Sequence, residues 1–407
     1  MPPELIPLPR PCPCCLHMEA DRIHRHPLAP IAGASLHAGY DVVACQRCGG
    51  VFASPLPAQS DFDRHYAQQS KYEDATSLGA PSTVDQRRFA AIAQGLAQAL
   101  PERSVRLLDL GCATGGLLLA LQQQGFTALS GLDPSSACAA YARSLTGAPV
   151  HAGSLFEPLP GGPYEVLTAI GVFEHLRDLD AAVPGLSGAL VPGGLLYLEV
   201  PDLLGFPAST EAPFQEFSSE HVTFFTGRSL DVLMGRFGFE RAFGGTLQRI
   251  HSGGSRMQVL ALAYRKTTAI RPGIEKDLEG PAAAVEYVRI SLERDRPLQA
   301  LLAELAAGDE PFAVWGAGTL SCRLMAASPL ARAPIAAFVD SNPHLQGKTL
   351  GGREIHPPAW LRGFSGPILV ASLGHGPAIE ASLRGELALA NPVILLPIPP
   401  PPAQGLV

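Results

Sequence analysis

The chain has few charged residues and no dense basic segment. Asp, Glu, Lys and Arg make up 16% of its 407 residues, the formal net charge is -7 at pH 7, and no run of Lys and Arg stands out. Binding to nucleic acid or to an anionic membrane surface needs concentrated positive charge, so we expect neither partner. This composition favours small molecules as the partners.

Long apolar runs are missing as well. No run approaches the roughly 20 apolar residues of a membrane-spanning helix, and the N-terminal stretch MPPELIPLPRPCPCC lacks the layout of a signal peptide. The sequence therefore predicts a cytoplasmic protein. Its hydrophobic content of 46% is high enough for packed cores. Because the chain is longer than one core usually grows, we expect two or three domains.

The eight cysteines are unevenly distributed along the chain. Near the N-terminus, Cys12 and Cys15 form one Cys-x-x-Cys pair, and Cys45 and Cys48 form a second. Four thiolates at this spacing can surround Zn²⁺, and metal binding would stabilise a short segment rich in Pro, Cys and His. The alternatives are a disulfide pair or a redox-active pair, and Cys14 can replace Cys12 or Cys15 as a ligand. A closed four-thiolate site has no position for substrate, so we expect a structural metal.

Predicted helices and strands alternate from residue 84 onward. Apolar residues recur at helical spacing over 84–100, the strand VRLLDL follows, and the alternation continues to the strand GGLLYLEV. This order predicts an α/β fold with a parallel, Rossmann-like sheet and an antiparallel edge that ends near Lys266. A second alternating unit begins at PFAVWGAGT. We expect four parts: a zinc-binding module (1–75), a nucleotide-fold domain (76–266), a linker and helix (267–295) and a C-terminal Rossmann-like domain (296–407).

The segment LLDLGCATGGLLLAL has the pattern of a strand, a glycine-rich turn and a helix start. Asp109 lies at the end of this strand, and Gly111 and Gly115 bracket the turn, which allows a ligand to approach the positive end of the helix. The turn alone does not exclude a dinucleotide. At the end of the next strand, Asp133 can accept both hydroxyls of a ribose, or it can cap the helix that follows.

Four ordered segments, LLDLGCATGG, GLDPS, VFEHLRDL and LVPGGLLYLEVP, resemble those of class I S-adenosylmethionine-dependent methyltransferases. The resemblance covers about residues 84 to 265. It implies that the methionine portion of S-adenosylmethionine lies against Asp109, Gly111 and Gly115 and that Asp133 binds the ribose. It further implies that Gly153 and Ser154 border the adenine, and that Val172 and Phe173 flank the site.

A narrower resemblance covers nearly the whole chain. The paired cysteines, the segment EFSSEHVTFF and the segment FVDSNPHLQGKTLGGREIHPP resemble the zinc-binding nucleoside-diphosphate-sugar C-methyltransferases. This family implies Zn²⁺ at the N-terminus and a sugar nucleotide held between the middle and C-terminal domains. Ser218 stands where relatives that methylate sugar carbon have Tyr, so a related natural-product intermediate is also a candidate acceptor. Arg256, at the end of the HSGGSR turn, is a candidate for diphosphate binding or a solvated strand end.

Glu220 and His221 follow the fifth predicted strand, at the edge where ligands bind in this fold. A carbon next to a keto group, or a hydroxyl, must lose a proton before it accepts a methyl group. His221 is therefore the candidate general base, and Glu220 is the candidate group that orients it. The alternative is a loop histidine among core phenylalanines. A second pair, Glu174 and His175, is expected near the cofactor rather than the acceptor.

The C-terminal unit has its own glycine turn, with Gly316 and Gly318 after a strand and Asp340 at the end of the next strand. An NAD(P)-binding site here would make the protein an oxidoreductase or a bifunctional enzyme. Ser321 occupies the position of the third glycine, and a scaffold without ligand is another alternative. From the family resemblance we expect Gly316, Gly318 and Asp340 to contact the substrate. A non-catalytic binding module would keep the cofactor and lack a base.

Overall fold

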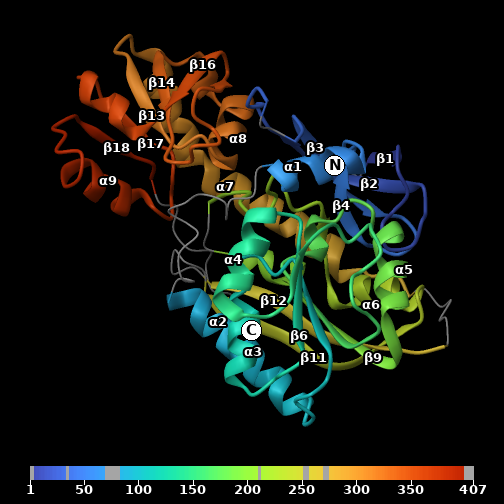
Figure 1. Ribbon diagram of the computed structural model, residues 1–407. Coiled ribbons are helices and arrows are strands. Elements are labelled where there is room, and N and C mark those ends of the chain that lie inside the picture. The colour runs from blue at the N-terminus through green and yellow to red at the C-terminus, as the bar shows by residue number, and fades with distance from the viewer. Residues whose placement is uncertain are drawn as a thin grey trace. The chain divides into compact units, whose positions relative to one another are not determined.

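The computed structural model describes residues 4–33, 36–68, 83–209, 212–250, 256–268 and 275–397. The chain divides into two compact units, unit 1 (Met1–Ile23, Val42–Phe206 and Glu220–Ala284) and unit 2 (His24–Asp41, Pro207–Ser219 and Val285–Val407) (Figure 1). These limits differ from those of the four predicted parts, which stay a prediction. Most of the predicted HSGGSR turn, residues 251–255, and the proline-rich tail from residue 398 lie outside the described residues.

A small sheet contains the N-terminal strands. Its order is β1-β2-β3-β4-β10, and helix α1 (Gln59–Gln68) follows β4. The last strand, β10, comes from much later in the chain and pairs antiparallel with β4, so that Thr223 lies opposite Phe52. This pairing holds the segment around residue 220 beside the N-terminal part of unit 1. The strands are β1 (Glu4–Pro7), β2 (Glu19–Pro27), β3 (Gly39–Cys45), β4 (Val51–Ser54) and β10 (Thr223–Phe224).

The large sheet of unit 1 has the order β11-β12-β9-β8-β5-β6-β7. The strands from β5 to β9 are parallel, and β12 and β11 add an antiparallel edge. This confirms the predicted parallel sheet and its edge hairpin. The strands are β5 (Leu107–Leu110), β6 (Leu129–Asp133), β7 (Val150–Ala152), β8 (Tyr164–Ile170), β9 (Leu190–Pro201), β11 (Phe239–Ile250) and β12 (Arg256–Lys266).

Helices cover both faces of this sheet. Figure 1 shows α2, α3 and α4 on one side and α5 and α6 on the other. Helix α2 confirms the helix predicted over 84–100. The helical segments are α2 (Thr83–Ala99), α3 (Gly116–Gln123), α4 (Ser136–Thr146), the 3-10 turn η1 (Phe173–His175), α5 (Leu179–Ala189), the 3-10 turn η2 (Leu203–Ala208) and α6 (Gly227–Gly235).

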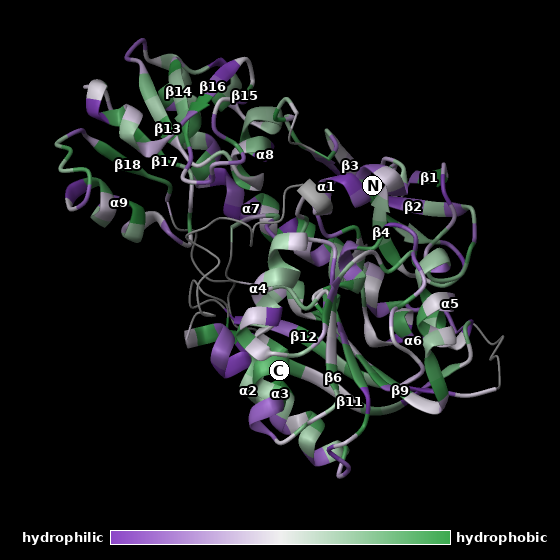
Figure 2. Cartoon of the chain, viewed as in Figure 1, coloured by the Kyte–Doolittle hydropathy of each residue, from purple (hydrophilic) through white to green (hydrophobic). Residues whose placement is uncertain are grey.

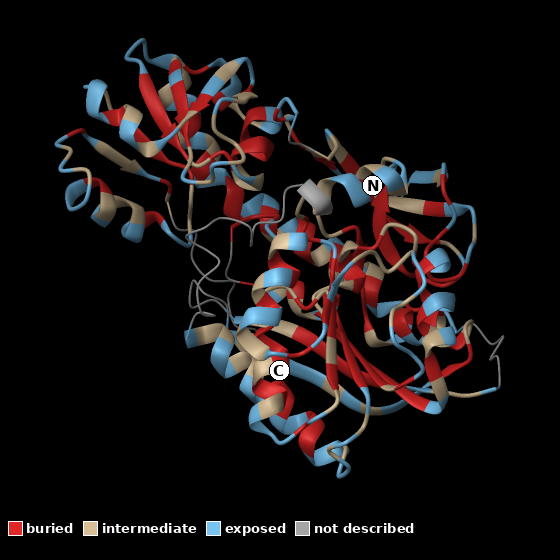
Figure 3. Cartoon of the chain, in the orientation of Figure 1, coloured by how far each residue is buried: buried red, intermediate tan, exposed pale blue. Residues whose placement is uncertain are grey.

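Alternate residues of each strand enter different cores. Leu107 packs with residues of α2, α3 and α4, whereas its neighbour Leu108 packs with residues of α5 and α6. Val166 and Leu167 of β8 divide in the same way. This is the period-two pattern of a strand whose two faces are both buried. Apolar residues accordingly gather along these strands in Figure 2, and Figure 3 shows the sheet largely buried.

Two details of the large sheet differ from the prediction. Strand β7 is only three residues long and was not predicted, because so short a segment has no detectable period. The predicted Pro-Gly-Gly turn is an irregularity inside β9, which already begins at Leu190. There the register shifts between Tyr164 and Val166 of the neighbouring strand, and Gly193 has a φ of +77°.

Unit 2 contains a second, smaller sheet with the order β15-β16-β14-β13-β17-β18. All of its pairs are parallel except β15 with β16, a short hairpin that was not predicted. The strands are β13 (Phe312–Trp315), β14 (Ile335–Val339), β15 (Thr349–Leu350), β16 (Arg353–His356), β17 (Ile368–Val370) and β18 (Val393–Leu395). The helical segments are α7 (Glu279–Ala307), whose first residues belong to unit 1, α8 (Thr319–Ala327), η3 (Pro329–Arg332), η4 (Pro358–Gly363) and α9 (Gly376–Arg384).

None of the helices in the described ranges is both long and apolar enough to cross a membrane.

Candidate functional site

The glycine turn between β5 and α3 tolerates no side chain at two positions. Gly111 has a φ of +66°, and a Cβ there would lie 2.8 Å from Cγ2 of Val172. Gly115 has a φ of +84°, and its Cβ would lie 3.0 Å from the Cβ of Ala142. Both the left-handed backbone and the close neighbours therefore require glycine. The turn follows β5 at the carboxyl edge of the sheet, and its residues 111–115 are partly or fully buried.

Asp133 ties this turn to the next strand. Its Oδ2 accepts a hydrogen bond from the N–H of Ala113 at 2.8 Å, and its Oδ1 accepts one from the N–H of Ser135 at 2.9 Å. The helix cap proposed as the alternative role is supplied by Ser135, whose Oγ accepts from the N–H of Cys138 at 3.1 Å. Asp133 therefore shapes the glycine turn, and its predicted ribose contact stays a prediction.

Asp109 is a buried carboxyl group beneath the same turn. Its Oδ1 accepts a hydrogen bond of 2.7 Å from the hydroxyl of Thr168 on β8. Burial raises the pKa of Asp109 from 3.8 to about 7, the nearby charge of Asp133 adds to the increase, and the Thr168 bond opposes it. The carboxyl group is thus poised to change its protonation state near neutral pH.

The residues predicted around the adenine have different environments. The N–H of Gly153 donates to the carbonyl of Asp133 at 3.0 Å, which places Gly153 at the carboxyl edge of the sheet. The hydroxyl of Ser154 accepts from the N–H of Phe156 at 3.2 Å. Val172 is half-buried at the start of η1, whereas the side chain of Phe173 is completely buried in the core. Of these last two, Val172 is the one with surface left to offer a ligand.

The two Glu-His pairs, which are about 45 residues apart in the sequence and were expected in different places, lie together in unit 1. The ring of His221 meets the ring of His175 edge to face, with centroids 4.8 Å apart and an angle of 83°. His175 also lies between two carboxylates: its Nε2 is 4.0 Å from Oε1 of Glu174, and its Nδ1 is 3.9 Å from Oε2 of Glu220. The N–H of Val222 donates to the carbonyl of Glu174 at 2.8 Å and fixes the two segments to each other.

Tyr66 completes this cluster and was missed by the sequence analysis. Its hydroxyl lies 3.0 Å from Nδ1 of His175, within hydrogen-bonding distance. Burial and the charges of Glu220 and Glu174 raise the pKa of the Tyr66 phenol well above 10, so it is a neutral donor and acceptor at neutral pH. We call Tyr66, Glu174, His175, Glu220 and His221 the histidine cluster. No local signal marks Tyr66, because it joins the cluster through tertiary packing.

Four of the five N-terminal cysteines form a second cluster in unit 1. The sulfur atoms of Cys12 and Cys48 are 3.6 Å apart, and those of Cys15 and Cys45 are 3.5 Å apart. One ligand atom from each of the four lies within 4.8 Å of the others, and all four side chains are buried. No pair forms a disulfide. The fifth, Cys14, is also buried.

Arg256 begins β12 and is exposed, opposite Ile250. This position suits a solvated strand end as well as a diphosphate ligand, so its binding role stays a prediction.

The C-terminal glycine turn of unit 2 resembles the first turn in its bonding. Gly316 has a φ of +107°, and Gly318 precedes α8. Oδ2 of Asp340 accepts from the N–H of Ala317 at 2.7 Å, as Asp133 does from its own turn. The hydroxyl of Ser321, at the position of the third glycine, donates to the carbonyl of Gly316 and so stabilises the turn. The predicted substrate contacts of this turn stay predictions.

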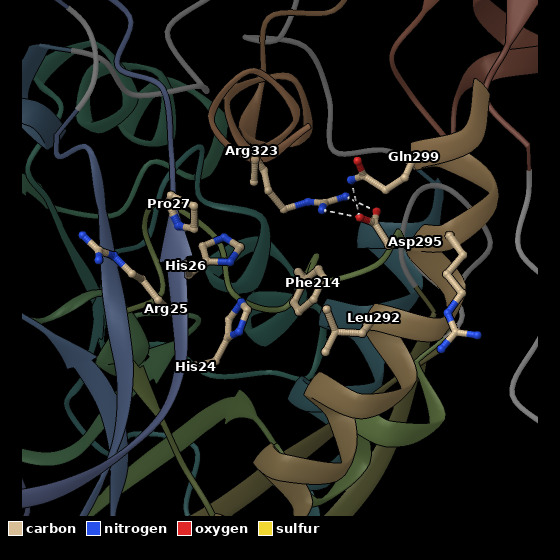
Figure 4. A pocket seen from close by; sticks show the side chains of 11 residues that line it. His24, Arg25, His26, Pro27, Phe214, Leu292, Asp295, Gln299 and Arg323 are labelled. Carbon is tan, nitrogen blue, oxygen red and sulfur yellow. Dashed lines mark hydrogen bonds and ion pairs between the residues drawn. The ribbon is translucent and has the colours of Figure 1, made fainter. Parts of the chain in front are cut away.

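Unit 2 also contains a pocket of about 470 Å³ that the sequence analysis missed (Figure 4). The ring of His24 stacks on that of Phe214 at 4.8 Å, and Phe214 has a φ of +62°, which is strained for a bulky residue. Arg323 and Asp295 form a buried two-pronged ion pair with hydrogen bonds of 2.7 and 3.1 Å. The pocket joins segments distant in sequence, so no local pattern marks it.

The large sheet of unit 1, with its antiparallel last strand and its glycine turn after the first strand, has the architecture of a class I methyltransferase. The family model described as "Methyltransferase domain" matches residues 84–241. The chain therefore carries a class I S-adenosylmethionine-dependent methyltransferase domain. This confirms the resemblance on which the predicted fold, enzyme class and cofactor rest.

The individual relatives share only about a third or less of the aligned residues with this chain. The chain is 27% identical to the C-methyltransferase NovU of Streptomyces niveus over 276 residues, 62% of each protein. It is 34% identical to the trans-aconitate 2-methyltransferase of Rhizobium leguminosarum bv. trifolii over 115 residues, 28% of this chain and 45% of that one. The chain thus spans less than two thirds of the length of these relatives.

Among solved structures, the magnesium protoporphyrin IX methyltransferase of Synechocystis PCC 6803 with bound S-adenosylhomocysteine is similar over 51% of this chain and 99% of that one. Its sequence is 14% identical and the TM-score is 0.40.

Proposed function

We propose that the whole protein transfers a methyl group from S-adenosylmethionine to carbon in a small acceptor, a nucleotide-linked keto sugar or a related natural-product intermediate. The observation that carries the proposal is the histidine cluster, which gathers two imidazoles, two carboxylates and a phenol in the methyltransferase unit. The similarity to NovU, named as a C-methyltransferase, supports carbon as the site of methylation.

In this proposal, His221 removes the proton from the acceptor carbon next to the carbonyl. The electron pair left on the acceptor then attacks the methyl carbon of the sulfonium, and the carbon–sulfur bond breaks to give S-adenosylhomocysteine. A histidine suits this step because its unperturbed pKa lies near neutral pH. His175 packs edge to face against His221 and limits its rotation. Glu220 and Tyr66 hold His175 in turn through its Nδ1, so Glu220 acts on His221 through His175.

The cofactor is proposed to lie along the glycine turn. Gly111 and Gly115 let the turn pack tightly against Val172 and Ala142, and the methionine portion would lie against this turn, with Asp109 and Asp133 at or next to the ends of β5 and β6. Gly153 and Ser154 would border the adenine, and Val172 would flank the site. S-adenosylmethionine supplies an activated methyl group when bound, so the remaining task of the chain is to place the acceptor and take its proton.

Zn²⁺ is the proposed partner of the cysteine cluster. A tetrahedral zinc with Zn–S bonds of about 2.3 Å separates its sulfur atoms by roughly 3.8 Å, close to the observed 3.5 and 3.6 Å. Cys12, Cys15, Cys45 and Cys48 would fill all four positions, and so the metal would be structural. Its role would be to hold the N-terminal segment that carries Tyr66.

A methyl-transfer assay tests the proposal. Methyl-labelled S-adenosylmethionine is incubated with a panel of nucleoside-diphosphate keto sugars, and label in the sugar is measured. We expect transfer by the wild type and a loss of at least about 100-fold in His221→Asn, because general-base catalysis contributes about 10² to 10⁴. S-adenosylhomocysteine binding should be unchanged. The control His375→Asn changes an exposed histidine of unit 2 and should keep full activity. Full turnover by His221→Asn would remove His221 as the base.

A further inference from the structure

Three members of the histidine cluster have the donor set of a metal site. Glu174, His175 and His221 each place one ligand atom within 4.8 Å of the other two. Two imidazole nitrogens and one carboxylate oxygen suit zinc and related divalent ions of the first transition series. A tetrahedral ion with bonds of about 2.1 Å needs ligand atoms roughly 3.4 Å apart. Side-chain rotations that bring these atoms closer by up to about 1.4 Å would reach that geometry.

The charges around these donors also favour a dication. The side chain of Glu174 is 5% exposed, and that of Glu220 lies on the other side of His175. With neutral imidazoles the two ionised carboxylates give this cluster a formal charge of -2. The side chain of Glu220 is 36% exposed, so the costly buried charge is that of Glu174, and a bound divalent ion would compensate it.

Neighbouring groups orient His175 as a metal ligand. Its Nδ1 lies 3.0 Å from the Tyr66 hydroxyl and 3.9 Å from the Glu220 carboxylate. If Nδ1 carries the proton and donates it toward these oxygens, Nε2 keeps its lone pair on the side of Glu174, 4.0 Å away. Metal-binding histidines commonly have this arrangement of a ligating nitrogen and a second nitrogen that donates to an acidic group.

We propose that Glu174, His175 and His221 bind a divalent transition-metal ion, with Zn²⁺ the best fit, and that this ion inhibits methyl transfer. The inhibitory part rests on the proposed function. A metal ion on His221 uses the lone pair that would otherwise take the proton of the acceptor. The site is distinct from the cysteine cluster, which has four sulfur donors. Free zinc would then control how much of the enzyme has a working base.

Cobalt binding tests the site without any acceptor. Full-length protein that keeps its cysteine-bound zinc is titrated with Co²⁺ alone, and visible absorption is recorded. We expect one further equivalent with weak bands of nitrogen and oxygen ligands, and no intense sulfur-to-cobalt band. Glu174→Gln and His175→Ala should lose this equivalent, Tyr66→Phe should weaken it about 10- to 100-fold, and the exposed control His375→Ala should keep it.

Inhibition is measured separately. Zn²⁺ should stop methyl transfer by the wild type, and a chelator that spares the cysteine site should restore it. If the wild type binds no ion beyond the cysteine site, or if its additional equivalent survives in both Glu174→Gln and His175→Ala, the metal proposal is wrong. Transfer unaffected by a bound second ion would contradict the inhibitory role. Neither outcome bears on the proposed function, because that function is tested by comparing methyl transfer by His221→Asn and by the wild type without added metal.

Discussion

Replacing Asp109 by Asn should stabilise unit 1, and more so at high pH. The carboxyl group is buried, and its pKa of about 7 lies above the ordinary 3.8. Between these values the folded protein holds a proton that the unfolded chain has released. Stability contributed by the protonated carboxyl is complete below about pH 4 and is lost as the pH rises through 7. Asn is neutral at every pH, and its Oδ1 can still accept from the Thr168 hydroxyl.

The size of the effect follows from the two pKa values. Relative to low pH, the raised pKa of Asp109 lowers the stability of the folded state by about 2 kcal/mol near pH 5, where only the unfolded chain has released the proton, and by about 4 kcal/mol near pH 8.5, at 1.4 kcal/mol per pKa unit. The advantage of Asp109→Asn over the wild type should therefore grow by about 2 to 3 kcal/mol between these two values of pH. Asp309→Asn, an exposed change, should show no such growth.

The assay must report on unit 1. Both Trp residues, Trp315 and Trp360, lie in unit 2, so tryptophan fluorescence would report the unfolding of unit 2 instead of unit 1. Amide hydrogen exchange of peptides from β5 and β6, measured by mass spectrometry, reports the opening of unit 1. An advantage of Asp109→Asn that stays constant or shrinks as the pH rises would refute the argument that burial raises this pKa.

Three further changes have defined outcomes. Cys48→Ser should lose about one equivalent of zinc by metal analysis, whereas Cys322→Ser in unit 2 should keep it. Arg323→Met should destabilise unit 2 by about 3 to 5 kcal/mol in denaturant unfolding because Asp295 stays buried, and adding Asp295→Leu should recover most of the loss; no recovery would contradict this. Burial lowers the pKa of His24 to about 4 and that of His26 to about 3, so both are neutral when folded. Stability of unit 2 should fall as the pH drops from 6.5 to 4, by about 3 kcal/mol for His26 alone, and His26→Phe should reduce that fall.

Local patterns were enough to predict the two mainly parallel sheets and both glycine turns, but not the small N-terminal sheet. The helix α2, the parallel strands and the edge hairpin each have a clear period over their own residues. The placement of Gly111 and Asp133 follows from strand ends, because the carboxyl ends of parallel strands meet at one edge. Segments too short to show a period, such as β7 and the β15–β16 hairpin, could not be predicted in this way.

The histidine cluster was only half predictable. His221 and His175 were each identified as polar residues after strands, but their contact goes with the hydrogen bond from Val222 to Glu174, and the approach of the N-terminal part goes with β10 pairing with β4. That pairing joins segments about 170 residues apart, and no local propensity specifies it. Tyr66 enters the cluster by the same route. The unit 2 pocket was missed for the same reason, because Phe214 and Arg323 come from distant segments of the chain.

Calorimetric titration with S-adenosylhomocysteine and, separately, with NAD tests the central claim most directly. The methyltransferase account predicts one tight site for S-adenosylhomocysteine, a large loss of affinity in Gly111→Ala because its Cβ would meet Val172, and no binding of NAD. Binding of NAD without binding of S-adenosylhomocysteine would contradict it and would identify the C-terminal glycine turn as the site of a different enzyme.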